Sequence, residues 1–357
     1  MTKLHHLQAL RGVAANLVVL DHGFSAMIKY GAVPAHFQAA SWHLGEMGVT
    51  MFFVISGFIM TYTSYDAMGK TGAPYLFLEK RIIRVVPLYW MATLLAFILF
   101  FIAGRPDGVG NLVKSLLFIP YYADGSADIR PVLGQGWTIN YEIFFYLIFA
   151  LALLMKPAKA FYFLIAAFLL FVGVGFSLDA QGLHAGAIAE AWTDPIILYF
   201  LIGALLGWVR VRTSVDVGIG RPLALAFAMI LLSEGIFHLT GGSWAAAIIC
   251  PILSIIAVIA CTFSPDGSDG IVHKISELLG DGSYSTYLFH TFILAVLNRL
   301  ILGHADASMT LYLVLALLGA NLGGVAMYLG LERPVTNALR NAIHARRRMA
   351  LMASVET

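Results

Sequence analysis

Long apolar runs separated by short polar segments dominate this chain. The separating segments are rich in glycine, proline and charged residues, for example between Asp66 and Lys80. Because a helix needs about 20 mostly apolar residues to cross a bilayer, the runs predict transmembrane helices. Ten candidate spans follow, at residues 8–28, 47–65, 85–103, 138–155, 160–178, 192–209, 221–238, 244–263, 285–302 and 308–330. The pattern therefore predicts an all-α polytopic membrane protein with about ten transmembrane helices.

A shorter apolar segment lies in the longest loop, at about residues 104–136. Residues 112–122 (LVKSLLFIPYY) are too few to span a bilayer and include Lys114. They favour an interfacial or re-entrant segment.

The composition supports burial of these runs in lipid. Hydrophobic residues make up 60% of the 357 residues and charged residues only 12%, whereas soluble domains carry about 25% charged residues. A soluble chain of this length could not cover so much apolar surface. The net charge of +2 argues against a nucleic-acid partner, because there is no dense basic surface to displace counterions.

The two cysteines, Cys250 and Cys261, lie 11 residues apart in one apolar run, about 16 Å along a helix. They cannot bridge each other and they match no metal-binding pattern. Packed apolar side chains are the simpler interpretation.

Basic residues divide unequally between the two sides that ten spans create. With the N-terminus in the cytoplasm, 17 (22 − 5) of the 22 Lys and Arg residues fall on the inner side, which follows the positive-inside rule. The five on the outer side are Lys29, Arg105, Lys114, Arg130 and Arg299. Arg11 and His22 interrupt the first apolar run, so we interpret it as a retained helix rather than a signal peptide. Both termini are expected in the cytoplasm.

The first predicted span carries two ionisable residues, within LQALRGVAANLVVLDH. Arg11 and His22 are 11 residues apart, close to three helical turns, so they share one face of the helix about 16 Å apart along its axis. Ionisable residues within a span are costly and indicate functional sites by default. A snorkelling Arg11 and a hydrogen-bonded core His22 are the structural alternatives. Asp21 points elsewhere, because adjacent helical side chains do not face each other.

Two further blocks place small or basic residues among apolar ones. Ser56 and Gly57 form a polar notch in GVTMFFVISGFIM, where Gly57 permits the approach either of a ligand or of a second helix. In EKRIIRVVPLYW, Arg81 and Arg84 are three residues apart and project from one side of the helix. Arginine can bind phosphates bidentately, but such a pair is also an ordinary topology signal.

Glu142 lies about one turn inside the aromatic segment WTINYEIFFY. An unpaired carboxylate there is costly, so we expect a cation, the His22 imidazole or an acceptor hydroxyl beside it. Trp137 and Tyr141 in the same segment are typical of an aromatic belt at the membrane surface.

The segment GDGSYSTYLFH places Ser283, Tyr287 and His290 at positions i, i+4 and i+7, on one polar helical face. This face suits either a ligand or hydrogen bonds between helices. The chain contains no P-loop, dinucleotide-binding, zinc-protease or nucleophile-elbow motif, and we expect no metal.

Together and in this order, these blocks resemble the acyltransferase-3 family of integral membrane acyltransferases, over roughly residues 7–335. The most specific block is LRGVAANLVVLDH, which fits the arginine–histidine pattern of that family through Arg11 and His22. FFVISGF, KRIIRVVPLYW, WTINYEIFFY, SYSTYLFH and LERP follow in the expected order. The chain is also similar to exopolysaccharide O-acetyltransferases.

The resemblance implies a polar cavity within the helices. It also implies an acyl-CoA donor, usually acetyl-CoA, and an acceptor hydroxyl on a surface or exported polysaccharide or its lipid-linked precursor. Residues 1–335 would form the membrane acyltransferase domain and residues 336–357 a basic cytoplasmic tail. The protein would be integral to the cytoplasmic (inner) membrane. Its expected partners are the lipid bilayer, the glycan acceptor and proteins of polysaccharide biosynthesis or export.

In this interpretation Arg81 and Arg84 bind the phosphates of acetyl-CoA. His22 takes the proton of a sugar hydroxyl that attacks the thioester, and a covalent acetyl-histidine is the less favoured variant. Arg11 is required with His22, and Glu142 either orients His22 or holds the sugar. Residues assigned to substrate binding are Tyr141, Ser283 and His290, and no permanently bound cofactor is expected.

Two other classes of protein would also place ionisable groups in a membrane. One is a transporter or flippase that moves a lipid-linked sugar without chemistry. The sequence shows no inverted repeat, which disfavours the common transporter plans. The other is a structural partner of a polysaccharide export complex, which would not need His22.

Overall fold

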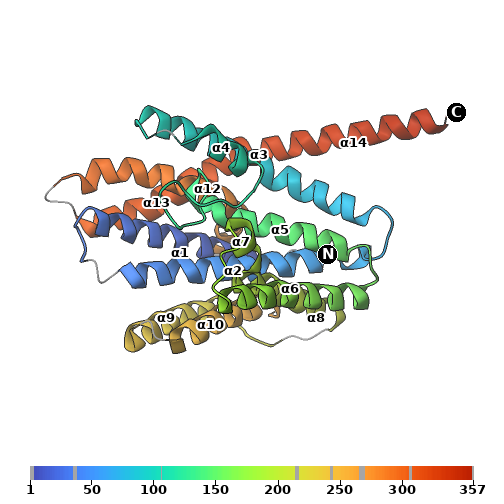
Figure 1. Cartoon of the computed structure of the whole chain (residues 1–357), viewed down its shortest axis with the longest axis horizontal. Coiled ribbons are helices and arrows are strands. Elements are labelled where there is room, and N and C mark those ends of the chain that lie inside the picture. Colours follow the sequence, from blue (N-terminus) through green and yellow to red (C-terminus); the bar gives the residue numbers. More distant parts are fainter. Residues whose placement is uncertain are drawn as a thin grey trace.

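The fold is built from helices packed side by side (Figure 1). The computed structural model describes residues 4–34, 38–105, 107–213, 217–241, 244–264, 270–304 and 308–355. Within these residues there is no β-strand, and a single antiparallel bridge joins Tyr122 to Ile129. The predicted all-α class is therefore confirmed.

Each of the ten apolar runs coincides with a helix. These helices are α1 (His5–Lys29), α2 (Gln38–Ser64), α3 (Ala73–Ile102), α5 (Trp137–Ala152), α6 (Pro157–Ala180), α8 (Leu198–Arg212), α9 (Pro222–Thr240), α10 (Trp244–Thr262), α12 (Ser283–Leu297) and α13 (Met309–Met327). π-Helical turns continue the last two, as η5 (Asn298–Leu302) and η6 (Tyr328–Glu332). The apolar pattern thus located the helices correctly.

The number of membrane spans differs from the prediction of about ten. By length and composition, seven helices in the described part of the chain could cross a membrane. Helix α5 has only 16 residues, and α10 contributes a shorter apolar segment, Ala247–Thr262. Helix α1 is long enough but carries Arg11, Asp21 and His22. A count of ten is therefore not confirmed.

Shorter helices connect or flank these elements. They are α4 (Val109–Leu116), α7 (Ala187–Thr193), α11 (Ile271–Asp281) and the turns η2 (Tyr65–Ala67), η3 (Gly134–Gly136) and η4 (Pro195–Ile197). Helix α4 overlaps the first part of the predicted interfacial segment, has eight residues and is too short to span a bilayer. The C-terminal helix α14 (Arg333–Val355) projects from the bundle (Figure 1). Arg347 in α14 donates a 2.6 Å hydrogen bond to Glu79 Oε2 in α3.

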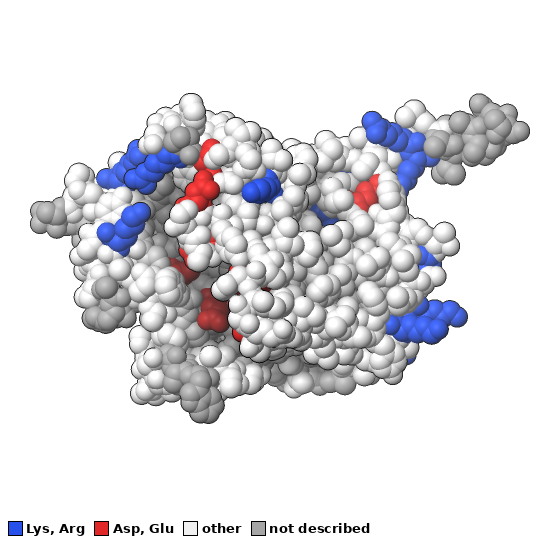
Figure 2. Space-filling view, in the orientation of Figure 1, with Lys and Arg blue, Asp and Glu red and all other residues white. Residues whose placement is uncertain are grey.

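Apolar side chains cover the outside of the bundle. Leu170 of α6, Leu231 of α9 and Leu322 of α13 are each more than 60% exposed. Most Lys and Arg side chains visible in Figure 2 lie toward the two ends of the helices, and much of the surface between them is uncharged. A soluble protein rarely exposes so wide an apolar surface. The chain is therefore a multi-pass membrane protein.

Glycines allow α2 and α8 to approach each other closely. A Cβ atom at Gly57 would meet the carbonyl oxygen of Phe200, and one at Gly203 would meet that of Val54. At Gly207 a Cβ would lie 2.8 Å from the carbonyl oxygen of Phe58. We call Gly57, Gly203 and Gly207 the glycine seam. Of the two alternatives for Gly57, the structure shows the approach of a second helix, as small residues permit in membranes.

We expect Gly57→Ala to lower the thermal stability of the purified protein. The added methyl group forces α2 away from α8, and such overpacking costs about 1–3 kcal/mol. Gly173→Ala in α6 is the matched control, because nothing lies within 4 Å of a Cβ there and alanine favours the helix. Melting of both variants in detergent, followed by size-exclusion chromatography, tests this. Equal melting temperatures would contradict the close packing.

Candidate functional site

A cavity lies among α1, α2, α3, α5 and α12. Its empty volume is about 760 Å³, part of which is open to the outside. Most of its wall is apolar or aromatic. The apolar and aromatic lining comes from Val49, Phe52, Phe53, Ile55, Ile59, Met60, Val85, Ile139, Tyr146, Tyr284 and Tyr287. The predicted polar cavity stays a prediction, because only a minority of the lining residues are polar.

Three arginines and one glutamate are the charged lining residues: Arg11, Arg81, Arg84 and Glu142. All four are residues that the sequence motifs predict for the site, and they come from three separate helices. Three positive and one negative side chain give the lining a formal net charge of +2 (3 − 1). The structure therefore brings the predicted donor-binding arginines together with Arg11 and Glu142.

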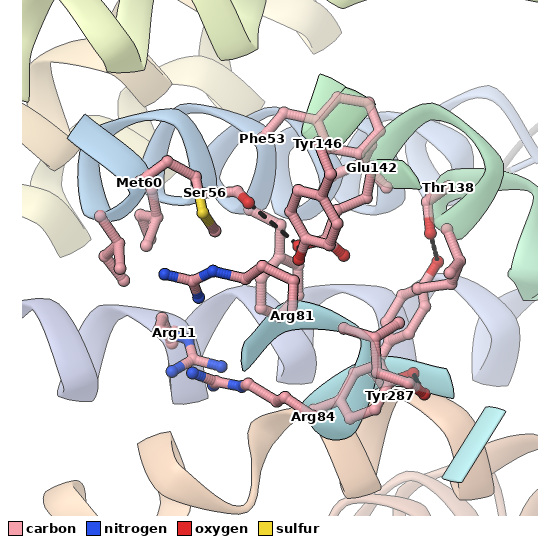
Figure 3. A pocket seen from close by; sticks show the side chains of 17 residues that line it. Arg11, Phe53, Ser56, Met60, Arg81, Arg84, Thr138, Glu142, Tyr146 and Tyr287 are labelled. Atoms are coloured by element: carbon pink, nitrogen blue, oxygen red, sulfur yellow. Dashed lines mark hydrogen bonds between the residues drawn. The ribbon is translucent and has the colours of Figure 1, made fainter. Parts of the chain in front are cut away.

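The guanidinium groups gather at one side of the cavity (Figure 3). Arg11 donates to Gln8 Oε1 at 3.1 Å, and Arg81 donates to Thr63 Oγ1 at 3.4 Å. Arg81 Nε is buried and has no hydrogen-bond partner among the described residues. The ion pairs found in the described part of the chain involve other side chains. Donor groups on the cavity wall are thus available to an anion.

Glu142 is held by two hydroxyl groups. Ser56 Oγ donates to Glu142 Oε1 at 3.0 Å, and the hydroxyl of Tyr146 donates to the same oxygen in a short hydrogen bond. The expectation of a polar partner is confirmed. The alternative that this partner is the His22 imidazole is wrong. Tyr146 follows Glu142 by four residues, one helical turn, so the spacing could have revealed it.

His22 contacts His290 instead. His22 Nδ1 and His290 Nε2 are 2.7 Å apart, and the two rings are nearly parallel, with 19° between their planes and centroids 4.9 Å apart. Neither histidine lines the cavity. Tyr287 connects the two regions, because it lines the cavity and its ring centroid is 6.1 Å from that of His290. The phenyl ring of Phe52 packs edge-on against Tyr287 at 5.8 Å.

Among the described residues, the Asp21 carboxylate is hydrogen-bonded to two serines and not to His22. Its Oδ1 accepts hydrogen bonds from Ser41 Oγ at 2.9 Å and from Ser25 Oγ at 3.4 Å. The expectation that Asp21 points away from its neighbour is therefore confirmed.

The two other residues assigned to substrate binding, Tyr141 and Ser283, lie outside the cavity wall like His290. Tyr141 is buried and packs against Phe53 and Trp137, with ring centroids 6.1 and 5.6 Å away. The aromatic-belt interpretation is wrong for Tyr141, because its ring faces the protein interior. Ser283 is fully buried and its Oγ has no hydrogen-bond partner among the described residues. The substrate-binding roles of both stay predictions.

Glu332 is a buried carboxylate that the sequence patterns did not predict as a site residue. It lies in the π-helical turn η6 and accepts a 2.6 Å hydrogen bond from Ser285 Oγ. It shares a small hollow with Arg84. The LERP motif marks this position in the sequence. It does not predict the π-helical turn η6, in which the Glu332 side chain is buried.

The chain is similar to known proteins over most of its length. The acyltransferase domain family matches residues 4–329. The exopolysaccharide production protein ExoZ of Rhizobium meliloti (strain 1021) is 35% identical over 317 residues, which cover 82% of this chain and 90% of that protein. The acyltransferase MdmB of Streptomyces mycarofaciens is 26% identical over 331 residues, which cover 85% of this chain and 82% of that protein. No solved structure matches significantly.

Proposed function

This chain belongs to the acyltransferase domain family, and from this premise we propose that it moves an acetyl group from acetyl-CoA to a hydroxyl of an exported polysaccharide or its lipid-linked precursor. The family makes the protein a membrane O-acyltransferase. The identities of its acyl donor and of its acceptor are our proposal. The name of its relative ExoZ, which refers to exopolysaccharide production, supports a polysaccharide acceptor.

The observation that carries the donor assignment is the group of three arginines on one cavity wall. Coenzyme A is an anion with several phosphate groups, and guanidinium groups bind phosphate bidentately. Arg81 Nε, which has no hydrogen-bond partner in the described part of the chain, supplies an unused donor. The apolar lining beyond the arginines suits the pantetheine arm and the acetyl group.

Acetyl-CoA is cytoplasmic, so this proposal places the arginine side of the cavity toward the cytoplasm. That orientation agrees with the excess of basic residues on the inner side in the ten-span scheme. It puts both chain termini at the cytoplasmic face of the inner membrane. Proteins of polysaccharide biosynthesis or export would then supply or remove the acceptor.

His22 is the proposed general base. A neutral imidazole has one ring nitrogen with a free lone pair, which can accept the proton of a hydroxyl group. Tyr287 lines the cavity and its ring lies against His290, with centroids 6.1 Å apart. The acetyl thioester would therefore reach His22 past the ring of Tyr287.

The direct test is release of free CoA from acetyl-CoA by the purified protein in lipid nanodiscs. We expect thiol release that depends on added glycan acceptor. NMR of surface polysaccharide from strains with and without the gene identifies the acceptor through its O-acetyl content. Movement of a lipid-linked glycan between leaflets without CoA release would contradict acyl transfer and favour a flippase.

We expect Arg84→Ala to raise the KM for acetyl-CoA about fivefold with little change in kcat. A partly exposed charge contact contributes up to about 1 kcal/mol, and each 1.4 kcal/mol is about tenfold in affinity. Arg105→Ala is the control, because Arg105 is exposed and does not line the cavity. An unchanged KM in well-folded Arg84→Ala protein would leave Arg84 as a topology signal only.

A further inference from the structure

His290 lies in the middle of a short series of hydrogen-bonding groups. Its Nε2 is 2.7 Å from His22 Nδ1. Its Nδ1 is 2.7 Å from the carbonyl oxygen of Tyr287 and 3.2 Å from that of Thr286. Carbonyl oxygens only accept hydrogen bonds. His290 Nδ1 therefore carries a hydrogen.

The burial of His290 determines whether its Nε2 carries a hydrogen. The side chain is 0% exposed within α12, and its hydrogen bonds in the described part of the chain involve the His22 ring and two carbonyl groups, with no carboxylate. An imidazolium cation without a counter-charge is costly inside a membrane protein. His290 is therefore neutral, and its Nε2 holds a lone pair. The hydrogen shared between the two rings must belong to His22 Nδ1.

The consequence concerns the reactive atom of His22. Since Nδ1 is occupied as a donor, the neutral His22 ring keeps its free lone pair on Nε2. Among the described residues, the hydrogen bonds of His22 involve Nδ1 alone. His22 is also partly exposed, unlike His290. We propose that His290 is a positioning residue that fixes the tautomer of His22 and makes Nε2 the atom that accepts the acceptor's proton.

This inference rests on the proposed acyl transfer and assigns its proton. The hydroxyl proton of the acceptor moves to His22 Nε2 as the hydroxyl oxygen forms a bond to the thioester carbonyl carbon. The carbon–sulfur bond then breaks, and the departing CoA thiolate takes the proton back from Nε2. During the step the positive His22 ring donates from Nδ1 to the lone pair of His290, which stabilises it.

A neutral orienting group differs from the carboxylate that often orients a catalytic histidine. The second histidine selects the same tautomer but adds no negative charge to a buried site. The carbonyl oxygen of Tyr287 replaces the carboxylate as the last acceptor of the series. The tautomer therefore depends on the helical backbone of α12.

The decisive measurement is ¹⁵N NMR of histidine-labelled protein in nanodiscs, with the His22 signals assigned through His22→Ala. We expect the hydrogen on Nδ1 in both His22 and His290. A wild-type protein with the hydrogen on His22 Nε2 would overturn the proposal. This readout needs no turnover, so absence of CoA release would refute the proposed function and leave the tautomer result standing.

Two substitutions separate positioning from packing. His290→Leu removes the acceptor for His22 Nδ1, so we expect kcat to fall roughly tenfold with the KM for acetyl-CoA unchanged, and hydrogen to appear on His22 Nε2. His290→Gln offers an amide oxygen as acceptor and should keep most of the wild-type kcat and the Nδ1 tautomer. Equal losses in both variants, or no loss in either, would contradict a positioning role.

Discussion

His22→Ala should abolish detectable acyl transfer while the protein remains in the membrane at its normal level. A general base contributes roughly 10² to 10⁴ in rate, and the substitution removes the nitrogen that accepts the proton. Loss of the ring also leaves His290 Nε2 without its hydrogen-bond partner. CoA release by the purified variant, and O-acetylation of polysaccharide in a complemented deletion strain, measure the effect.

His238→Ala is the matched control for a lost imidazole. The His238 side chain is 59% exposed on α9 and contacts Glu234, away from the cavity. We expect it to keep wild-type activity, with membrane levels of both variants compared by immunoblot. Full acetylation by His22→Ala would refute the base assignment.

Glu142→Gln should lower turnover more than tenfold while expression holds. The substitution keeps the size of the side chain but replaces an oxygen that accepts from Ser56 and Tyr146 by a group that is partly a donor. It also raises the formal charge of the cavity lining from +2 to +3 (3 − 0). A tenfold loss corresponds to about 1.4 kcal/mol in the barrier. Steady-state CoA release at saturating acetyl-CoA measures it.

Ser56→Ala is the comparison that isolates the charge of Glu142. It removes one hydroxyl donor to the carboxylate and leaves the charge in place, so the loss should be smaller, near the roughly 1 kcal/mol of one hydrogen bond. A fully active Glu142→Gln protein would show that the carboxylate serves neither binding nor turnover.

The helices could be predicted because their signal is local. An apolar run of about 20 residues matches the length of a helix that crosses a bilayer. Each such run is a helix in the structure. The number of spans could not be predicted as safely. Helix α1 carries its ionisable residues inside the bundle, where neighbouring helices rather than lipid surround much of the surface. Average apolarity does not distinguish those two environments.

The spacing of residues along one helix predicts which side chains share a face, but not which of them line the cavity. Spacing placed Arg11 and His22 on one helical face, yet Arg11 lines the cavity and His22 does not. Distance along the helix axis separates them, and the packing of α1 against α2, α3, α5 and α12 sets which of the two reaches the cavity. The partner of His22 is His290, 268 residues later. The spacing of residues within one helix cannot predict a contact with a residue on another helix.

The glycine seam has a consequence for the choice of acyl group. Helix α8 contributes no lining residue, but it fixes the position of α2, which supplies Ser56 and Phe53 to the cavity. A carbon atom added at Gly203 or Gly207 shifts α2 and so changes the width available to the acyl chain. The seam is therefore a remote place from which an engineer could change chain-length selectivity, at some loss of stability, while every side chain that touches the substrates stays as it is.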